Sequence, residues 1–209
     1  MSRFSFTDGI TNTPKLCIDT GHNNNVILGH NSYNTISDGY NDCTIIGNNV
    51  LCSGNSQVQL GSSNSNIYTT SGVQNTSDQR DKTEIRDTIL GLDFILKLRP
   101  VDYKWNCRRD YLVHTQQLHD IDYLNLPEIK ELPNDGSKTR RRFHHGVIAQ
   151  EVKNVMDTIG VDFGGYQDHS INGGKDQLTI AYTELIAPLI KSIQELNERI
   201  KVLESSKQT

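Results

Sequence analysis

The chain has no long hydrophobic run and few aromatic residues. No stretch is long enough to span a bilayer as a helix, and residues 1–8 lack the apolar run of a signal peptide. Aromatic residues make up 7% and hydrophobic residues 34% of the 209 residues, which is lean for a monomeric globule. This composition favours an elongated oligomer in which neighbouring chains share one core.

The chain also lacks a basic excess and a metal-binding cysteine pattern. Its formal net charge is -4, so nothing in the overall charge indicates a nucleic-acid partner. Cys17, Cys43, Cys52 and Cys107 form no CxxC pair or similar spacing. We therefore expect no metal or cofactor, and reduced thiols that are mostly buried as small apolar groups in a protein folded in a cytoplasm.

Charge is scarce in the first 76 residues, where only six residues are Asp, Glu, Lys or Arg. Three short β-type runs in this half, residues 26–29, 44–47 and 58–61, end in glycine and precede polar turns. A strand of four or five residues plus a tight Asn/Gly turn matches the seven-residue spacing of Gly47, Gly54 and Gly61. Two such strands make a coil of about fourteen residues, which predicts a β-roll or β-solenoid.

Such a thin coil has too small a core by itself, so stacking and association of several chains are expected to complete it. The pattern resembles the β-roll heads of trimeric autotransporter adhesins and the shafts of phage fibres. Residues 1–20 fit no coil and are interpreted as an attachment segment. The polar turns are candidates for binding a host-surface glycan, although solvated turns without a ligand account for them better.

Residues 76–82, Thr-Ser-Asp-Gln-Arg-Asp-Lys, separate this half from a charged half with helical patterns. A serine hydroxyl is a poor nucleophile unless a base lies beside it, and a lysine amine that is kept neutral can be that base. Ser77 and Lys82 are close enough in sequence for one helical turn or a tight loop to join them. Spacing alone favours the alternative that Ser77 or Asp78 caps a helix and Lys82 lies in solvent.

An ordered series of motifs favours the interpretation of Ser77 and Lys82 as a dyad over the interpretation as a helix cap and a solvated lysine. The motifs are Ser77-Asp78-x-Arg80-x-Lys82, Ile89-Leu90-Gly91-Leu92, Leu98-Arg99-Pro100-Val101, Tyr103-x-Trp105, Gly146-Val147-Ile148-Ala149-Gln150-Glu151-Val152 and Tyr182-x-x-Leu185. Over about residues 77–204 the series resembles the intramolecular chaperone and auto-protease domain at the C-terminus of phage tailspikes, tail fibres and endosialidases. The same type of domain occurs in the myelin regulatory factor.

The resemblance implies a domain that drives trimerisation and folding of the preceding fibre and then cuts itself off. The family's Ser–Lys dyad falls on Ser77 and Lys82, and its cleavage site falls between Thr76 and Ser77. Asp78 is expected to orient the loop or to cap the following helix. The resemblance also implies a virion protein folded in the host cytoplasm, with itself as partner and with neither nucleic acid nor membrane insertion.

Hydrophobic spacing predicts the elements that follow this site. We expect a helix over residues 88–98 with Asp87 as its cap, and a strand over residues 101–105. A second helix is expected over residues 147–156, and Gly160 lies just beyond its end.

The link over residues 107–142 is longer than is usual in the family. It holds enough apolar residues for part of it to pack, and the four cations of residues 138–142 are interpreted as a solvated loop rather than a basic patch for an acidic partner. His144 and His145 are left outside the site. Gln150 and Glu151, which match a family motif, are expected to make packing or polar contacts near it.

The chain ends in a predicted strand over residues 177–182 and a helix that Thr183 is expected to cap. The apolar seam of this helix alternates at spacings of three and four: Ile186, Leu189, Ile193, Leu196, Ile200 and Leu203. Ile at a with Leu at d favours two strands in model coiled coils, whereas the family is trimeric. We follow the family, because so short a seam cannot dictate assembly against a larger trimeric interface.

These patterns predict an α+β C-terminal chaperone domain that ends in a coiled-coil helix, preceded by an all-β repeat segment, in an elongated homotrimer. The predicted domains are residues 1–76 and 77–209, with the coiled coil at about 183–204. The predicted function is a viral tail-fibre or tailspike protein with a single-turnover, self-cleaving serine endopeptidase. The alternatives are a non-cleaving structural fibre and a glycan-binding tip protein.

Overall fold

A computed structural model describes residues 3–7, 14–19, 24–29, 32, 40–48, 50, 52–62, 65–114, 129–172 and 177–207. The protein is α+β, with one long C-terminal helix and several small sheets. It divides into two compact units, of which the first holds Met1–Tyr68, Lys104–His144 and His169–Gln177 and the second holds Thr69–Tyr103, His145–Asp168 and Leu178–Thr209. Within the described residues, no helix combines the length and apolarity needed to cross a membrane.

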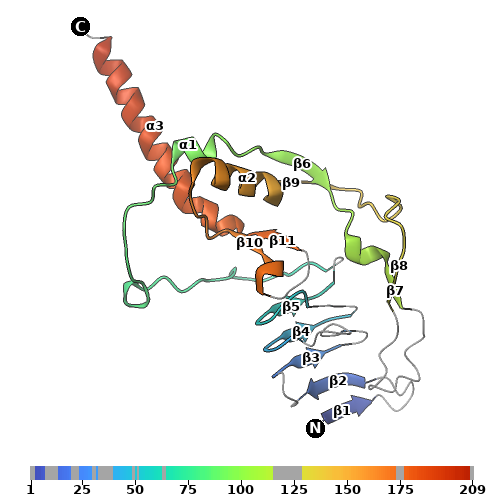
Figure 1. Cartoon of the computed structure of the whole chain (residues 1–209). Coiled ribbons are helices and arrows are strands. Elements are labelled where there is room, and N and C mark those ends of the chain that lie inside the picture. Colours follow the sequence, from blue (N-terminus) through green and yellow to red (C-terminus); the bar gives the residue numbers. More distant parts are fainter. Residues whose placement is uncertain are drawn as a thin grey trace. The chain divides into compact units, whose positions relative to one another are not determined.

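The first unit contains a five-stranded sheet in the order β1 (Arg3–Thr7), β2 (Pro14–Asp19), β3 (Val26–Leu28), β4 (Thr44–Ile46) and β5 (Val58–Leu60) (Figure 1). β1 and β2 form an antiparallel pair, and β2 also pairs antiparallel with β3. Residues 1–20, which the sequence suggested as an attachment segment outside any coil, therefore add two strands to the edge of this sheet.

The three glycine-terminated runs form β3, β4 and β5, which pair in parallel and in register. Each strand is followed by a glycine with positive φ, at Gly29, Gly47 and Gly61. Backbone bonds join the successive turns, since the Gly47 N–H donates to Leu28 O and the Gly61 N–H to Ile46 O, both at 2.8 Å. The strands start at residues 26, 44 and 58, so the first interval is longer than the fourteen residues expected for a coil.

A small core lies beneath this β3–β5 stack. Its buried members are Tyr40, Cys43, Ile45, Val50 and Cys52, with Ile27 packed against them. Asn25 links adjacent segments, because its Nδ2 donates to Tyr40 O and its Oδ1 accepts from the Cys43 N–H, both at 2.9 Å. The expectation of buried, reduced thiols is confirmed at Cys43 and Cys52. Burial, and then the neighbouring Cys43 thiol, raise the pKa of Cys52 to about 12.

The long link of residues 107–142 packs in part, as expected. A 3₁₀ turn (Arg108–Tyr111) leads into β7 (Leu112–His114), which pairs antiparallel with β8 (Ile129–Glu131). The Tyr111 side chain is buried, and its hydroxyl accepts a hydrogen bond from the Lys138 N–H at 3.1 Å. Arg140 forms a 2.7 Å ion pair with Asp110, so one of the four cations of residues 138–142 is not simply solvated. The two-stranded sheet of β6 (Val101–Lys104) and β9 (Phe143–Gly146) includes the positions where the chain passes between units.

The second unit is built from three helices and the antiparallel pair β10 (Tyr166–Asp168) and β11 (Leu178–Ile180). Its helices are α1 (Leu92–Ile95), α2 (Ala149–Ile159) and α3 (Ile186–Ser206). Its core consists of Phe94, Val152, Met156 and Phe163, in which the two phenylalanine rings lie 5.3 Å apart. Gly160 ends α2 in the left-handed conformation (φ 68°), as its predicted place beyond the helix requires.

The helix expected over residues 88–98 is much shorter in the structure. α1 begins only after Gly91, whose extended φ and ψ (-126°, -144°) are not helical, and Asp87 caps nothing there. Thr88 Oγ1 instead accepts a hydrogen bond from the Leu90 N–H at 3.1 Å. A local side-chain bond of this kind competes with helix formation, which the hydrophobic spacing could not reveal.

Helix α3 presents two faces. Pro188 and Ser192 are buried on the face toward α1, and the six predicted seam residues are all exposed. A 3₁₀ turn (Tyr182–Leu185) precedes the helix, so Thr183 lies inside that turn and Leu185 is the N-cap position. The C-terminal part of α3 extends beyond α1 and α2 (Figure 1). The helix therefore packs on its own unit and keeps its heptad seam free.

Candidate functional site

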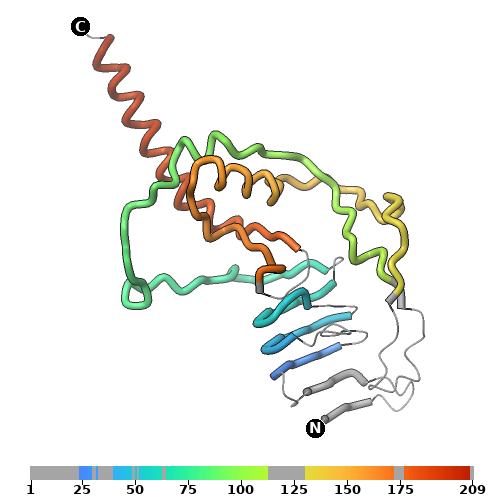
Figure 2. The backbone as a smooth tube through the Cα atoms, in the orientation of Figure 1, coloured from blue at the N-terminus to red at the C-terminus, as the bar shows by residue number. Residues whose placement is uncertain are grey.

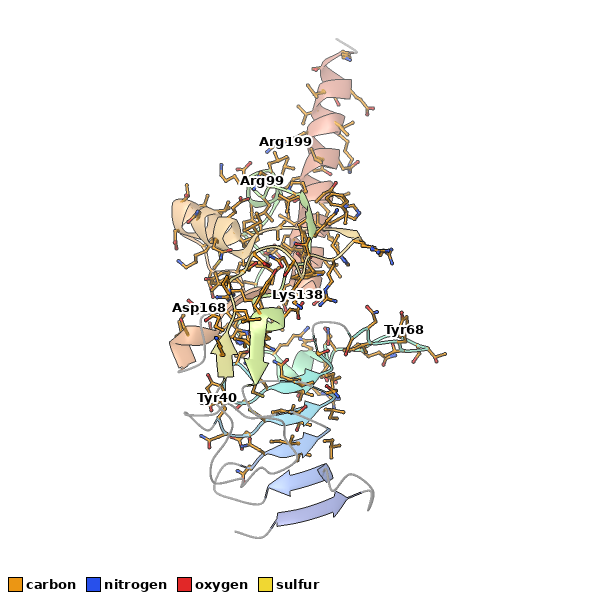
Figure 3. All side chains as sticks on the ribbon, turned by 90° about the vertical axis from the view of Figure 1, so that its right-hand side faces the viewer. Tyr40, Tyr68, Arg99, Lys138, Asp168 and Arg199 are labelled. Carbon is orange, nitrogen blue, oxygen red and sulfur yellow. The ribbon has the colours of Figure 1, made fainter. Side chains whose placement is uncertain are left out.

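The candidate site lies on an exposed segment. Every residue from 65 to 87, a stretch that we call the arm, has an exposed side chain. The arm follows an extended course (Figure 2) and carries large apolar side chains, among them Tyr68 at 89% exposed, which projects into open space in Figure 3. An arm of this kind gains little from burial within its own chain.

A short turn gives the arm local order around the predicted site. The 3₁₀ turn Gln79–Asp81 has Asp78 as its N-cap, and Asp78 Oδ1 accepts a hydrogen bond from the Arg80 N–H at 2.9 Å. The Arg80 guanidinium pairs with the same carboxylate at 2.6 Å. The Arg80 side chain, and then its backbone N–H, hold the pKa of Asp78 below its ordinary value. Asp78 therefore acts here as a cap.

The turn brings Ser77 and Lys82 together. Lys82 Nζ donates a hydrogen bond to Ser77 Oγ at 2.7 Å, and both side chains are exposed. A backbone bond from the Lys82 N–H to Gln79 O, at 3.1 Å, closes the turn between them. The distance suits proton transfer between a nucleophile and a base, and the hydroxyl belongs to the residue directly after Thr76.

The lysine lies in water in the single chain, and this matters for its chemistry. An ammonium donates hydrogen bonds but cannot accept a proton, so a lysine base has to be neutral. Burial away from water is one physical route to a neutral amine. The Ser77–Lys82 pair therefore has the contact that a Ser–Lys dyad needs but not the enclosure.

The other residues singled out in the sequence have partners of their own. The Glu151 carboxylate is bound by the Arg99 guanidinium, whose side chain keeps the pKa of Glu151 below its ordinary value. His145 Nδ1 lies 2.6 Å from Asp102 Oδ1. The His144 ring lies beside Trp105, with 6.1 Å between centroids. Gln150 is exposed at the start of α2.

Two contacts at α3 were not predicted from the sequence. Tyr182, in the turn before α3, accepts a hydrogen bond at its hydroxyl from the Val147 N–H at 3.1 Å. Glu195 Oε2, on α3 itself, accepts one from the Leu92 N–H at 2.8 Å. Tyr182 and Val147 belong to two of the recognised motifs, but the sequence holds no signal that joins Glu195 to a residue so distant in the chain.

Among the described residues, no group of three His, Cys, Asp or Glu side chains could hold a metal ion.

Residues 77–161 match the model of a peptidase family that is described as chaperone of endosialidase. The matched segment begins at Ser77, contains Lys82, and ends just after α2. No curated protein and no solved structure matches the chain.

Proposed function

Residues 77–161 form a domain of the chaperone-of-endosialidase family, and on this premise we propose that the chain is a self-processing viral tail-fibre or tailspike protein. Its C-terminal half joins three copies and folds the β-repeat segment, and it then releases itself by cutting between Thr76 and Ser77. The observation that carries the proposal is the 2.7 Å contact between Lys82 Nζ and Ser77 Oγ, directly beside the bond to be cut.

The proposed reaction starts with a neutral Lys82 amine that takes the proton of the Ser77 hydroxyl. Ser77 Oγ then attacks the carbonyl carbon of Thr76, and the bond between that carbon and the Ser77 nitrogen breaks. The proton passes from Lys82 to the departing Ser77 amine. The result is an ester between the Thr76 carbonyl and Ser77 Oγ.

Water completes the reaction. It attacks the ester carbonyl, restores the Ser77 hydroxyl, and leaves a new C-terminal carboxylate on Thr76 and a new N-terminal amine on Ser77. One water molecule is consumed for each bond cut. The reaction needs no cofactor, and each chain performs it once.

Assembly supplies the enclosure that the single chain lacks. The exposed seam of α3 carries heptad spacing, which is the pattern for association with further copies of the same helix. Neighbouring copies that cover the arm would remove water from Lys82 and favour its neutral form. Cutting would then follow assembly, even though the Ser77–Lys82 contact already forms within one chain.

The β3–β5 stack is the segment that profits from a chaperone. Its strands pair in parallel, and parallel sheets are intrinsically slow to form. Joining the chains through α3 raises the local concentration of these strands and sets their register. We interpret residues 1–76 as the β-roll fibre segment of the virion, folded in the host cytoplasm and left kinetically trapped once the chaperone has gone.

The test is the intact mass of freshly expressed protein under denaturing conditions. The wild type is expected to give two fragments that meet at Thr76/Ser77, and Ser77→Ala a single full-length chain. Ser71→Ala is a matched control, because Ser71 lies on the same exposed arm and should leave cutting unchanged.

A single full-length species in all three samples would remove cleavage and leave a structural fibre with a silent serine and lysine. Native mass would then test the trimer by itself. Binding of the uncut Ser77→Ala protein on a glycan array would support the further proposal that the β-repeat turns bind a host-surface glycan.

A further inference from the structure

The first turn of α1 takes its cap from another helix. The N-cap residue, Gly91, has no side chain to offer, and the Leu92 N–H donates to Glu195 Oε2 at 2.8 Å. Leu92 is 4% exposed, so its N–H would lose a partner in a place that water scarcely reaches if the carboxylate were removed. Glu195 thus satisfies a backbone donor that the local sequence leaves open.

Gly91 makes room for this carboxylate. A Cβ added at Gly91 would lie 2.6 Å from Glu195 Oε1 and 2.7 Å from Oε2, well inside normal contact distance. Both halves of the contact are therefore adapted to each other: a residue without a side chain at position 91 and a carboxylate at position 195.

Glu195 also occupies a special position on α3. It lies on the side of the helix that carries the buried Pro188 and Ser192, and in sequence it stands between the seam residues Ile193 and Leu196. In a coiled coil the seam fixes the rotation of each helix about its axis. Fixing the rotation of α3 also fixes the direction in which the Glu195 carboxylate points.

The contact lies where the exposed arm gives way to the folded core. Leu90 packs against the core of the second unit, and Leu92 and Phe94 are buried, whereas residues 65–87 are all exposed. We propose that Glu195 is a positioning residue for self-cleavage, which holds the start of α1 and so ties the arm with Ser77 and Lys82 to the helix through which the copies associate. This inference rests on the proposed function.

The experiment follows the fraction of cut chain against time after a short pulse of cell-free synthesis of the full-length protein, with the trimer fraction measured by native mass in the same samples. Glu195→Ala is expected to slow cutting at least about fivefold at an unchanged trimer fraction. Glu195→Gln keeps an oxygen that can accept the Leu92 N–H, and it should restore the rate to within about twofold. Tyr182→Phe is the matched control, because it breaks another hydrogen bond of the α3 segment, to Val147, and should cut at the wild-type rate.

A double-mutant cycle tests whether the two positions act through one contact. Gly91→Ala should slow cutting in the wild-type background, because its Cβ displaces the carboxylate, and should add nothing in the Glu195→Ala background. Additive effects would overturn the inference. A wild-type cutting rate in Glu195→Ala would also overturn it, as would slower cutting that a parallel loss of trimer explains in full. An uncut wild type would instead overturn the proposed function itself.

Discussion

The β3–β5 stack and the arm that follows it are neighbours in the chain but are held in opposite ways. In the stack, strands pair in register, Asn25 bonds to two other segments, and Ile45 is fully buried. In the arm, all side chains from residue 65 to residue 87 are exposed, and order is local to one turn. The first segment buries a small core within the chain but leaves Val26, Ile46, Val58 and Leu60 exposed, whereas every side chain of the second is exposed.

This difference separates stability from reactivity. Substitutions in the stack should change the free energy of unfolding and leave the proposed dyad untouched. Substitutions of Ser77 or Lys82 on the arm should change cutting and leave the free energy of unfolding nearly unchanged. On the proposed function both segments depend on assembly: the arm for the enclosure of Lys82, and the stack for the rate at which its strands pair.

The largest effect is expected at Lys82. Lys82→Arg keeps a positive charge that can bond to Ser77 Oγ, but an arginine stays protonated and cannot act as the base. The cutting rate should fall a hundredfold to ten-thousandfold, with the unfolding midpoint unchanged. Fragment mass against time measures the rate. Cutting at the wild-type rate in Lys82→Arg would exclude Lys82 as the base.

A buried and an exposed isoleucine compare the two segments directly. Ile45→Ala removes a fully buried side chain from the stack and should lower the free energy of unfolding by about 3 kcal/mol. Ile85→Ala, on the arm, removes a side chain that is 64% exposed and should cost less than about 0.5 kcal/mol. Urea unfolding at one fixed protein concentration measures both. Equal costs would mean that the arm is packed in solution.

Two glycines make a similar pair. Gly29→Ala places a Cβ over the carbonyl oxygen of Gly47 and should destabilise the stack by about 2 kcal/mol or more, because backbone has to move. At Gly72, on the arm, φ is +79° but nothing lies within 4 Å of an added Cβ, so Gly72→Ala should cost only about 1 kcal/mol from the backbone conformation. Thermal unfolding of both variants separates the cost of the close backbone approach at Gly29 from the cost of a positive φ alone at Gly72. A smaller loss at Gly29 than at Gly72 would contradict the packing of these turns.

The last effect concerns alkaline pH and acts only on the stack. The Cys52 pKa is about 12 in the folded protein against an ordinary 9.0, so the folded state holds this proton more tightly than the unfolded state. The stabilisation is complete below pH 9 and is lost between about pH 9 and 12, with a slope of up to about 1.4 kcal/mol per pH unit. Cys52→Ser should flatten the stability profile in that window. An unchanged slope would show that other groups cause the alkaline loss.

Sequence patterns predicted the elements whose signals are local. β3, β4 and β5 follow from β-branched runs that end in glycine, and α2 and α3 follow from hydrophobic spacing. The Ser77–Lys82 contact also belongs to this class, because a single turn within the chain decides it. That the pair is a catalytic dyad stays a prediction.

Features that depend on distant partners were missed. β1 and β2 have no repeat signal; β2 takes its place by pairing with β3, and β1 by pairing with β2. The predicted helix over residues 88–98 was too long, because Gly91 adopts an extended conformation that suits the Glu195 carboxylate from a remote helix. Hydrophobic spacing records which faces are buried, but it does not record which backbone group a distant side chain will satisfy.

The glycine turns of the stack constrain how such a segment can vary in length. An added Cβ at Gly29 would overlap the backbone of Gly47, and one at Gly47 would lie 3.1 Å from Gly61 Cα, so each turn rests on the next with no space for a side chain. The contact holds across intervals of different length, since strands β3, β4 and β5 start at residues 26, 44 and 58, so extra residues between two turns are tolerated, whereas a further layer of the stack needs one more complete strand and turn. The length of such a segment along the stack is therefore expected to change in fixed increments, one strand and turn at a time.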